Sequence, residues 1–139
     1  TAAQIGQEQA WKDRASLVRE KGLEPIASTA ATRWFTEGFI KKNPKIVARL
    51  SSELGDGSNE GYASCCEALA KADLREEIKT ISIPVLVIVG TQDPVTTVKD
   101  GQFMINNIRS SALFEIDASH ISNIEQPQAF NKAIFDFIQ

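Results

Sequence analysis

The hydrophobic and polar positions divide the chain into two parts near residue 72. Before that point the apolar residues recur at helical spacing, which predicts four helices, over about 4–21, 25–40, 43–54 and 60–71. Asn43 and Pro44 mark the start of the third helix, because asparagine is a favoured N-cap and proline suits the first helical position. Gly22 is expected to end the first helix, and residues 55–59 to form a loop. The first part is therefore predicted to be entirely helical.

After residue 72 strands alternate with helices. A capping pattern in residues 73–76 predicts a short helix to about Lys79. Residues 83–89 form a continuous apolar, β-branched run, which is typical of a strand buried on both faces of a parallel sheet. A helix over about 97–107, a strand over 112–116 and a final helix from Pro127 follow. This β-α-β-α order predicts a parallel α/β unit. Two strands and two helices are too few to bury a parallel pair on both faces, so we expect further strands in a longer parent protein.

Composition and charge narrow the possible partners. A hydrophobic content of 42% can supply a core, and a net charge of −3 provides no basic surface for nucleic acid. No apolar run approaches the roughly 18 to 20 residues needed to cross a bilayer, so no membrane partner is predicted. The chain begins at Thr1 with no signal-peptide pattern and without Met, so we expect it to start inside a longer gene product.

The cysteines indicate thiols rather than a disulfide or a metal site. Cys65 and Cys66 are adjacent, and neighbouring cysteines rarely bridge. Their spacing places them with Tyr62 and Leu69 along one side of the fourth helix, as packing residues. Reduced thiols favour a cytoplasmic location. With one histidine and no Cys-x-x-Cys pair, no zinc site is predicted.

The candidate chemistry lies just after the two predicted strands. Asp93 follows the first strand and His120, the only histidine, follows the second. Catalytic groups of parallel α/β sheets lie on loops beyond the carboxyl ends of the strands, so these side chains should emerge at the same edge. There the carboxylate could orient the imidazole, and the imidazole could take a proton from a hydroxyl nucleophile. Alternatively, Asp93 could act only as a turn and helix cap, and His120 as an ordinary loop residue.

The nucleophile of such a triad is not found in this sequence. No serine has glycine at both i−2 and i+2, so the Gly-x-Ser-x-Gly turn is absent. Ser119 lacks the strained turn and the helix start that would form an oxyanion hole. Asp117 is a rival acid but lies too close to His120 along the chain. The sequence therefore predicts a general base and its acid partner, with the nucleophile supplied by polypeptide outside this chain.

Three stretches resemble the carboxyl-terminal part of α/β-hydrolases, and above all the 3-oxoadipate enol-lactonases. They are GYASCCEAL with DLR (residues 61–69 and 73–75), IPVLVIVGTQDP (83–94) and ASHISNIEQPQAF (118–130). The strand-Gly-x-x-Asp and histidine elements are common to the whole superfamily. The Cys-Cys stretch and His-Ile-Ser-Asn-Ile-Glu-Gln-Pro are more specific to the lactonases.

The resemblance implies a helical cap over residues 1–72 and the last part of the hydrolase core over residues 73–139. It implies Asp93 as the triad acid and His120 as the general base, acting on an enol-lactone of 3-oxoadipate without metal or cofactor. The amino-terminal core, with the serine and the oxyanion hole, would be the missing partner, so the chain alone should be inactive. From the residues themselves, Arg33 and Trp34 could bind the lactone carboxylate and its apolar part. Alternatively, Arg33 could be an ordinary surface residue beside two core aromatics, Trp34 and Phe35.

The sequence is compatible with two alternatives. The parent could be another capped α/β-hydrolase, such as an esterase or a carbon–carbon bond hydrolase, because the triad does not determine the substrate. The chain could also be a non-catalytic helical module. Its unpartnered parallel strands would then favour a homo-oligomer or an exchange of elements between copies.

Overall fold

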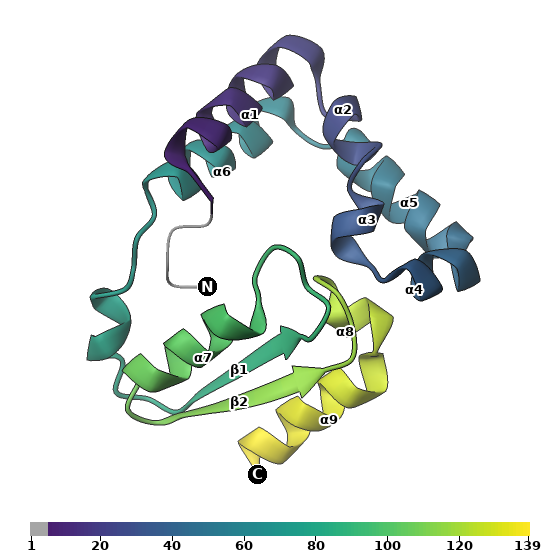
Figure 1. Cartoon of the computed structure of the whole chain (residues 1–139). Coiled ribbons are helices and arrows are strands. Elements are labelled where there is room, and N and C mark those ends of the chain that lie inside the picture. The colour runs from purple at the N-terminus through teal and green to yellow at the C-terminus, as the bar shows by residue number, and fades with distance from the viewer. Residues whose placement is uncertain (1–5) are drawn as a thin grey trace. The chain divides into compact units, whose positions relative to one another are not determined.

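Residues 6–139 are described by a computed structural model, shown in Figure 1, and they fall into two units. Residues 6–32 and 37–72 make up the helical unit. Residues 33–36 and 73–139 make up the α/β unit. The contacts thus change at residue 72, as the hydrophobic pattern does, but the short segment 33–36 belongs with the second half of the chain.

Two helices of the helical unit pack along each other, α1 (Glu8–Lys21) and α6 (Asn59–Lys71). Small buried side chains, Ala15, Ala63 and Cys66, lie between them, with Trp11 and Tyr62 against this cluster. Both cysteines are free, but only Cys66 is buried and Cys65 is exposed. The prediction that both cysteines are packing residues is therefore wrong for Cys65, because α1 packs against the Ala63–Cys66–Ala70 face of α6.

The ends of α1 test two expectations. Gly22 ends the helix with φ 73°, as predicted, and only glycine adopts this left-handed backbone readily. The helix begins at Glu8 rather than at the expected residue 4. Residues 4 and 5 lie outside the described part of the chain.

The prediction of one helix over residues 25–40 is wrong. Three short helices occupy this stretch, namely α2 (Glu24–Ala27), α3 (Ala31–Trp34) and α4 (Glu37–Lys42). After α2 the chain tightens, because the amides of Thr29 and Ala30 each bond the carbonyl three residues back. After α3 the amide of Thr36 bonds the Glu125 carboxylate instead of a helical carbonyl. A local tightening after α2 and a contact with a distant residue after α3 thus interrupt a helix that the periodicity favours.

The helix α5 (Pro44–Gly55) begins at the predicted residue. Asn43, however, donates its side-chain amide to the Phe39 carbonyl at 3.3 Å and makes no capping bond to α5. Val47 of this helix is buried, whereas its neighbour Ile46 is exposed. The loop before α6 is shorter than predicted, and Ser58 caps that helix by accepting a hydrogen bond from the Gly61 amide.

The α/β unit has the predicted β-α-β-α order. Strands β1 (Val85–Gly90) and β2 (Ser111–Ile116) pair in parallel, with Val85 opposite Ser111 and Gly90 opposite Ile116. The helix α7 (Val98–Asn107) lies on one side of this pair and α9 (Pro127–Ile138) on the other (Figure 1). A Cβ at Gly101 would lie 2.6 Å from Val89 Cγ1, so glycine lets α7 approach the sheet closely.

Two short helices differ from the sequence expectation. The helix expected from residue 73 is the 3-10 helix η1 (Glu77–Thr80), because the Asp73 carboxylate bonds the Arg75 amide and side chain instead of capping a helix there. The helix α8 (Ser122–Glu125), between His120 and α9, was not predicted. Pro127 opens α9 as expected.

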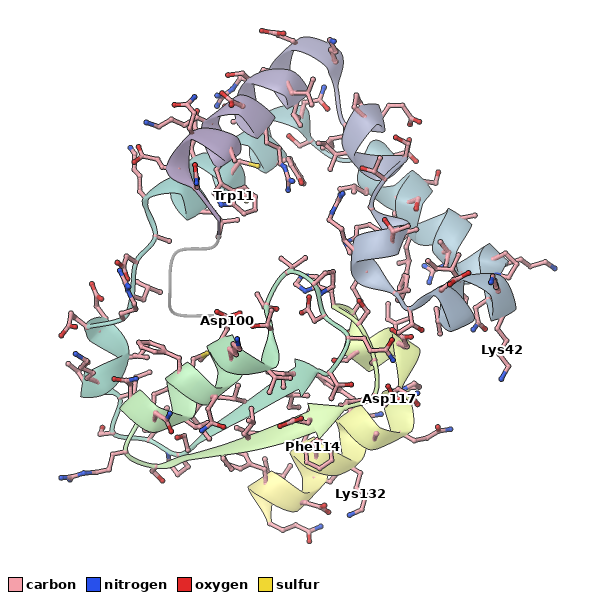
Figure 2. All side chains as sticks on the ribbon, viewed as in Figure 1. Trp11, Lys42, Asp100, Phe114, Asp117 and Lys132 are labelled. Carbon is pink, nitrogen blue, oxygen red and sulfur yellow. The ribbon has the colours of Figure 1, made fainter. Side chains whose placement is uncertain are left out.

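Much apolar surface of the α/β unit is exposed. The run before β1 is not strand, and Ile83 there is 68% exposed. Exposed aromatic residues include Phe114 on β2, labelled in Figure 2, and Phe135 and Phe137 on α9. Among residues 6–139 no strand other than β2 pairs with β1, so both strands have an open edge. The described helices include none that is long and apolar enough to cross a membrane.

Candidate active site

The loops that follow the two strands meet at one edge of the sheet. Because Gly90 and Ile116 are partners in the parallel register, both strands end at the same level. Two backbone hydrogen bonds then join the loops, from the Thr91 amide to the Ile116 carbonyl at 2.8 Å and from the Gln92 amide to the Ala118 carbonyl at 3.0 Å. Asp93 and His120 follow these hydrogen-bonded residues, and they therefore lie side by side.

The Asp93 and His120 side chains are in direct contact. His120 Nδ1 lies 2.8 Å from Asp93 Oδ2, a normal distance for a charge-assisted hydrogen bond. The Asp93 side chain is 4% exposed and that of His120 36% exposed. The acid is thus enclosed and the imidazole reaches the surface of the unit. This is the placement predicted from the strand ends, and the catalytic roles of the two residues remain proposals.

The Asp93 carboxylate is held ionised by its hydrogen bonds. Burial by itself raises the pKa of Asp93. The Thr96 hydroxyl, His120 and the amides of Val95 and Thr96 all bond this carboxylate and lower its pKa. The hydrogen bonds outweigh burial, and the pKa of Asp93 lies below its ordinary value.

The ionised acid fixes the proton on the imidazole. A carboxylate only accepts hydrogen bonds, so Nδ1 of a neutral His120 must carry the hydrogen that it shares with Asp93. Thr96 Oγ1 already donates to Asp93 Oδ2 at 2.6 Å, so it cannot also donate to Nδ1, 3.5 Å away. Nε2 is then the unprotonated nitrogen, and it can accept a proton from a hydroxyl group.

The segment 33–36 lies against the loop that carries His120. The Ile121 amide donates to the Trp34 carbonyl at 3.0 Å, and the Ser119 hydroxyl lies 3.3 Å from the Arg33 carbonyl. The Trp34 and Phe35 rings meet edge to face, with centroids 6.4 Å apart. The structure therefore brings the backbone of Arg33 and Trp34 beside the histidine loop, and substrate contact by their side chains remains a prediction.

The other candidate side chains are engaged elsewhere. Asp117, beyond the end of β2 in Figure 2, accepts a hydrogen bond from the Gln92 side chain at 2.7 Å. Ser119 is buried, with its hydroxyl near backbone carbonyls. Burial raises the pKa of Cys66, which disfavours its thiolate. Within residues 6–139 no cluster of three or more histidine, cysteine or acidic side chains could hold a metal ion.

Sequence reasoning missed two residues that support this site. Thr96 follows Asp93 by three positions, a spacing at which an aspartate commonly bonds the following amides, so this local signal was available. Glu125 bonds both the Ser119 amide and Thr36. Nothing in the local pattern pairs Glu125 with a residue so far away in the chain.

No protein-family model matches the chain. The chain is 66% identical over 134 residues to 3-oxoadipate enol-lactonase 2 of Acinetobacter baylyi, covering 96% of this chain and 50% of that protein. It is 44% identical to 3-oxoadipate enol-lactonase 1 of the same organism, over the whole chain and 52% of that protein.

A solved structure of an enol-lactonase is also similar to nearly the whole chain. The enol-lactonase of Burkholderia xenovorans LB400 superposes with a TM-score of 0.94 at 40% identity, covering 99% of this chain and 53% of that one. The chain thus spans about half the length of the relatives it matches. With the parallel β-α-β-α unit and the strand-end acid and histidine, these similarities show that the chain has part of an α/β-hydrolase fold and resembles about half the length of the 3-oxoadipate enol-lactonases.

Proposed function

We propose that this chain is part of an enol-lactone hydrolase, to which it contributes the acid and the base of a Ser-His-Asp triad. The observation that carries the proposal is the hydrogen bond between His120 Nδ1 and the buried Asp93 carboxylate at the carboxyl edge of the sheet. The names and the extent of similarity of the Acinetobacter relatives support the choice of substrate. The serine and the oxyanion hole would come from the remainder of the parent protein.

The proposed reaction uses the free Nε2 of His120. Nε2 removes the proton of the serine hydroxyl as the serine oxygen attacks the lactone carbonyl, and Asp93 stabilises the imidazolium that forms. The ring C–O bond breaks and the imidazolium returns its proton to the leaving oxygen, which gives an acyl-enzyme and an enol. The enol becomes the ketone by gaining a proton at carbon and losing one from oxygen. His120 then activates water, which releases 3-oxoadipate and restores the serine.

The exposed apolar surface supports the proposal that the chain needs the rest of a core. β1 is a run of apolar residues with one open edge, and α9 exposes Ile134, Phe135, Phe137 and Ile138. An open apolar edge strand is a pairing site, and large exposed apolar patches mark interfaces. In the parent we propose that further core strands and helices cover this surface, whereas the isolated chain could cover it only with a second copy.

A chimaera tests the proposed function. In it this chain replaces the matching half of 3-oxoadipate enol-lactonase 2 of Acinetobacter baylyi, which supplies the remainder of the fold. We expect the chimaera to hydrolyse 3-oxoadipate enol-lactone, followed by loss of the lactone absorbance, and the isolated chain to show none. A folded chimaera that prefers simple esters to the lactone would instead favour another capped hydrolase. A folded chimaera without hydrolase activity would refute the proposal.

Arg33 is proposed to bind the carboxylate of the lactone, and Trp34 to contact its apolar part. In the chimaera, Arg33→Met keeps an unbranched side chain and removes the charge. We expect the KM for the lactone to rise about 30-fold, because a hydrogen-bonded ion contact contributes about 2 kcal/mol. The KM for p-nitrophenyl acetate, which has no carboxylate, should change by less than about twofold, because it does not use that contact. An equal rise for both esters would contradict the role.

Thr96 is expected to stabilise the ionised form of Asp93. Thr96→Val removes the hydroxyl that bonds Asp93 Oδ2 and should destabilise the chimaera by about 2 kcal/mol at pH 7. The folded-state pKa of Asp93 lies below its unfolded-state value, so its ionisation stabilises the fold above about pH 4, and this contribution is lost as the pH falls through the folded-state pKa.

The loss caused by Thr96→Val should therefore shrink below about pH 4, where Asp93 of the unfolded chain becomes protonated, and disappear below the lower folded-state pKa. Urea unfolding at pH 7 and pH 3.5 measures both values. Thr91→Val is the matched control, because Thr91 is exposed in the same loop. A loss that is equal at both pH values would show that the hydroxyl does not act through the Asp93 charge.

A further inference from the structure

Glu125 lies where two segments far apart in the chain meet. It is the last residue of α8, and its partly buried carboxylate receives hydrogen bonds from both segments. One comes from the Ser119 amide at 2.9 Å, directly before His120. The others come from the amide of Thr36, at 3.3 Å to Oε1, and from the Thr36 hydroxyl. One carboxylate thus joins the histidine loop to the segment of Arg33 and Trp34.

The backbone on the other side of His120 is held by the same segment. The Ile121 amide donates to the Trp34 carbonyl at 3.0 Å. His120 is therefore bracketed, with the residue before it bonded to Glu125 and the residue after it bonded to Trp34. The segment 33–36 interrupts the helical part of the sequence, yet it belongs to the α/β unit that contains the triad acid and base.

We propose that Glu125 is a positioning residue, whose carboxylate fixes the loop of His120 to the segment that carries Arg33 and Trp34. The general base is then held at a fixed position relative to the proposed substrate-binding residues. The kinetic part of this inference rests on the proposed function. Its structural part does not, because the hydrogen bonds exist whatever the substrate is.

The chemistry of the contacts requires a carboxylate. The groups that face Glu125 from Ser119 and Thr36 are an amide, a second amide and a hydroxyl, and all three donate. A carboxylate offers two accepting oxygens and no hydrogen. A glutamine of the same shape would turn an N–H₂ group toward one of the amides. Glu125→Gln therefore removes the charge and part of the bonding while it preserves packing.

The test uses the chimaera, with 3-oxoadipate enol-lactone and p-nitrophenyl acetate as substrates. For Glu125→Gln we expect kcat to fall about tenfold with both substrates, because small misplacements of a catalytic group are costly. The KM should rise for the lactone alone, because only the lactone uses Arg33. Glu115→Gln is the control, since this glutamate is exposed on β2, and it should leave both constants unchanged.

Thr36→Val tests the contact of Glu125 with the segment 33–36 without changing its contact with the Ser119 amide. It removes only the hydroxyl donor from the segment 33–36, so we expect a higher KM for the lactone and a nearly unchanged kcat for p-nitrophenyl acetate. The double variant with Glu125→Gln should raise KM no further than Glu125→Gln alone, because both changes break one shared contact. Strictly additive effects would show two independent roles and would overturn the proposal.

Amide hydrogen exchange gives a measure that does not depend on turnover. In Glu125→Gln the peptides that cover residues 31–37 and 117–124 should both exchange faster, and peptides from α1 and α6 should not change. Unchanged exchange in either of the first two peptides, or kinetics equal to those of the unaltered chimaera, would overturn the inference. Faster exchange in both peptides of a chimaera that hydrolyses no lactone would refute the proposed function alone and leave the positioning contact intact.

Discussion

His120→Ala in the chimaera is expected to lower kcat/KM for the lactone about 10⁴-fold. Among residues 6–139 the imidazole is the group placed to take up a proton while it is held by a buried, ionised acid. Without the imidazole no base removes the proton of the serine hydroxyl, so the serine oxygen attacks the lactone carbonyl much more slowly. Steady-state hydrolysis of the lactone, with folding checked by circular dichroism, measures the effect.

Variants of two aspartates near the histidine, Asp93 and Asp117, serve as comparisons for His120→Ala. Asp93→Asn should cost nearly as much activity, because an amide can turn its N–H₂ toward Nδ1 and leave the imidazole in the wrong tautomer. Asp117→Asn should retain nearly full activity, because Asp117 bonds the Gln92 side chain and not His120. Near-normal turnover of His120→Ala, or an equal loss in Asp117→Asn, would reject the proposed triad.

Gly90→Ala is expected to destabilise the chimaera by about 3 kcal/mol and to lower its kcat. A Cβ at this position would lie 2.4 Å from the Ser119 carbonyl oxygen and 2.5 Å from that of Ala118. Both are backbone atoms, so no side-chain rotation can relieve the overlap. The loop of His120 would have to move away from the end of β1, and the imidazole would lose its alignment with Asp93. Thermal unfolding and lactone kinetics measure the two effects.

Gly38→Ala is the matched control for Gly90. Gly38 lies in α4, and nothing lies within 4 Å of the position of its added Cβ. Because alanine favours helices more than glycine does, this change should be neutral or stabilise by up to about 1 kcal/mol. If Gly90→Ala unfolded at the same temperature as the unaltered chimaera, the histidine loop would not require the close backbone approach described above.

Local patterns predicted the parts of this protein that depend on neighbours in sequence. Pro44 starts α5 and Gly22 ends α1, because the backbone preferences of proline and glycine act within one turn of helix. The two apolar runs predicted the parallel pair β1 and β2, although the first strand begins at Val85 and leaves Ile83 exposed. The strand ends in turn predicted that Asp93 and His120 would meet.

Local patterns failed where a distant group supplies the hydrogen-bond partner. Residues 25–40 have a helical pattern, but the Thr36 amide bonds Glu125, a residue 89 positions away. The helical spacing predicts an apolar face of α6 that includes Cys65, whereas α1 packs through Ala15 against the face with Ala63 and Cys66. In both cases the local sequence permits several arrangements, and the packing partner selects one of them.

The sequence by itself determined the alternation of strands and helices after residue 72 and the position of an acid and the only histidine at the two strand ends. Periodicity and strand direction are properties of short stretches, and they suffice to bring these two groups to one edge. Only the tertiary structure decided that residues 33–36 join the histidine loop and that Glu125 holds them together. The physical reason is that backbone amides need a partner but do not specify which one, so the choice depends on the folded arrangement of distant segments.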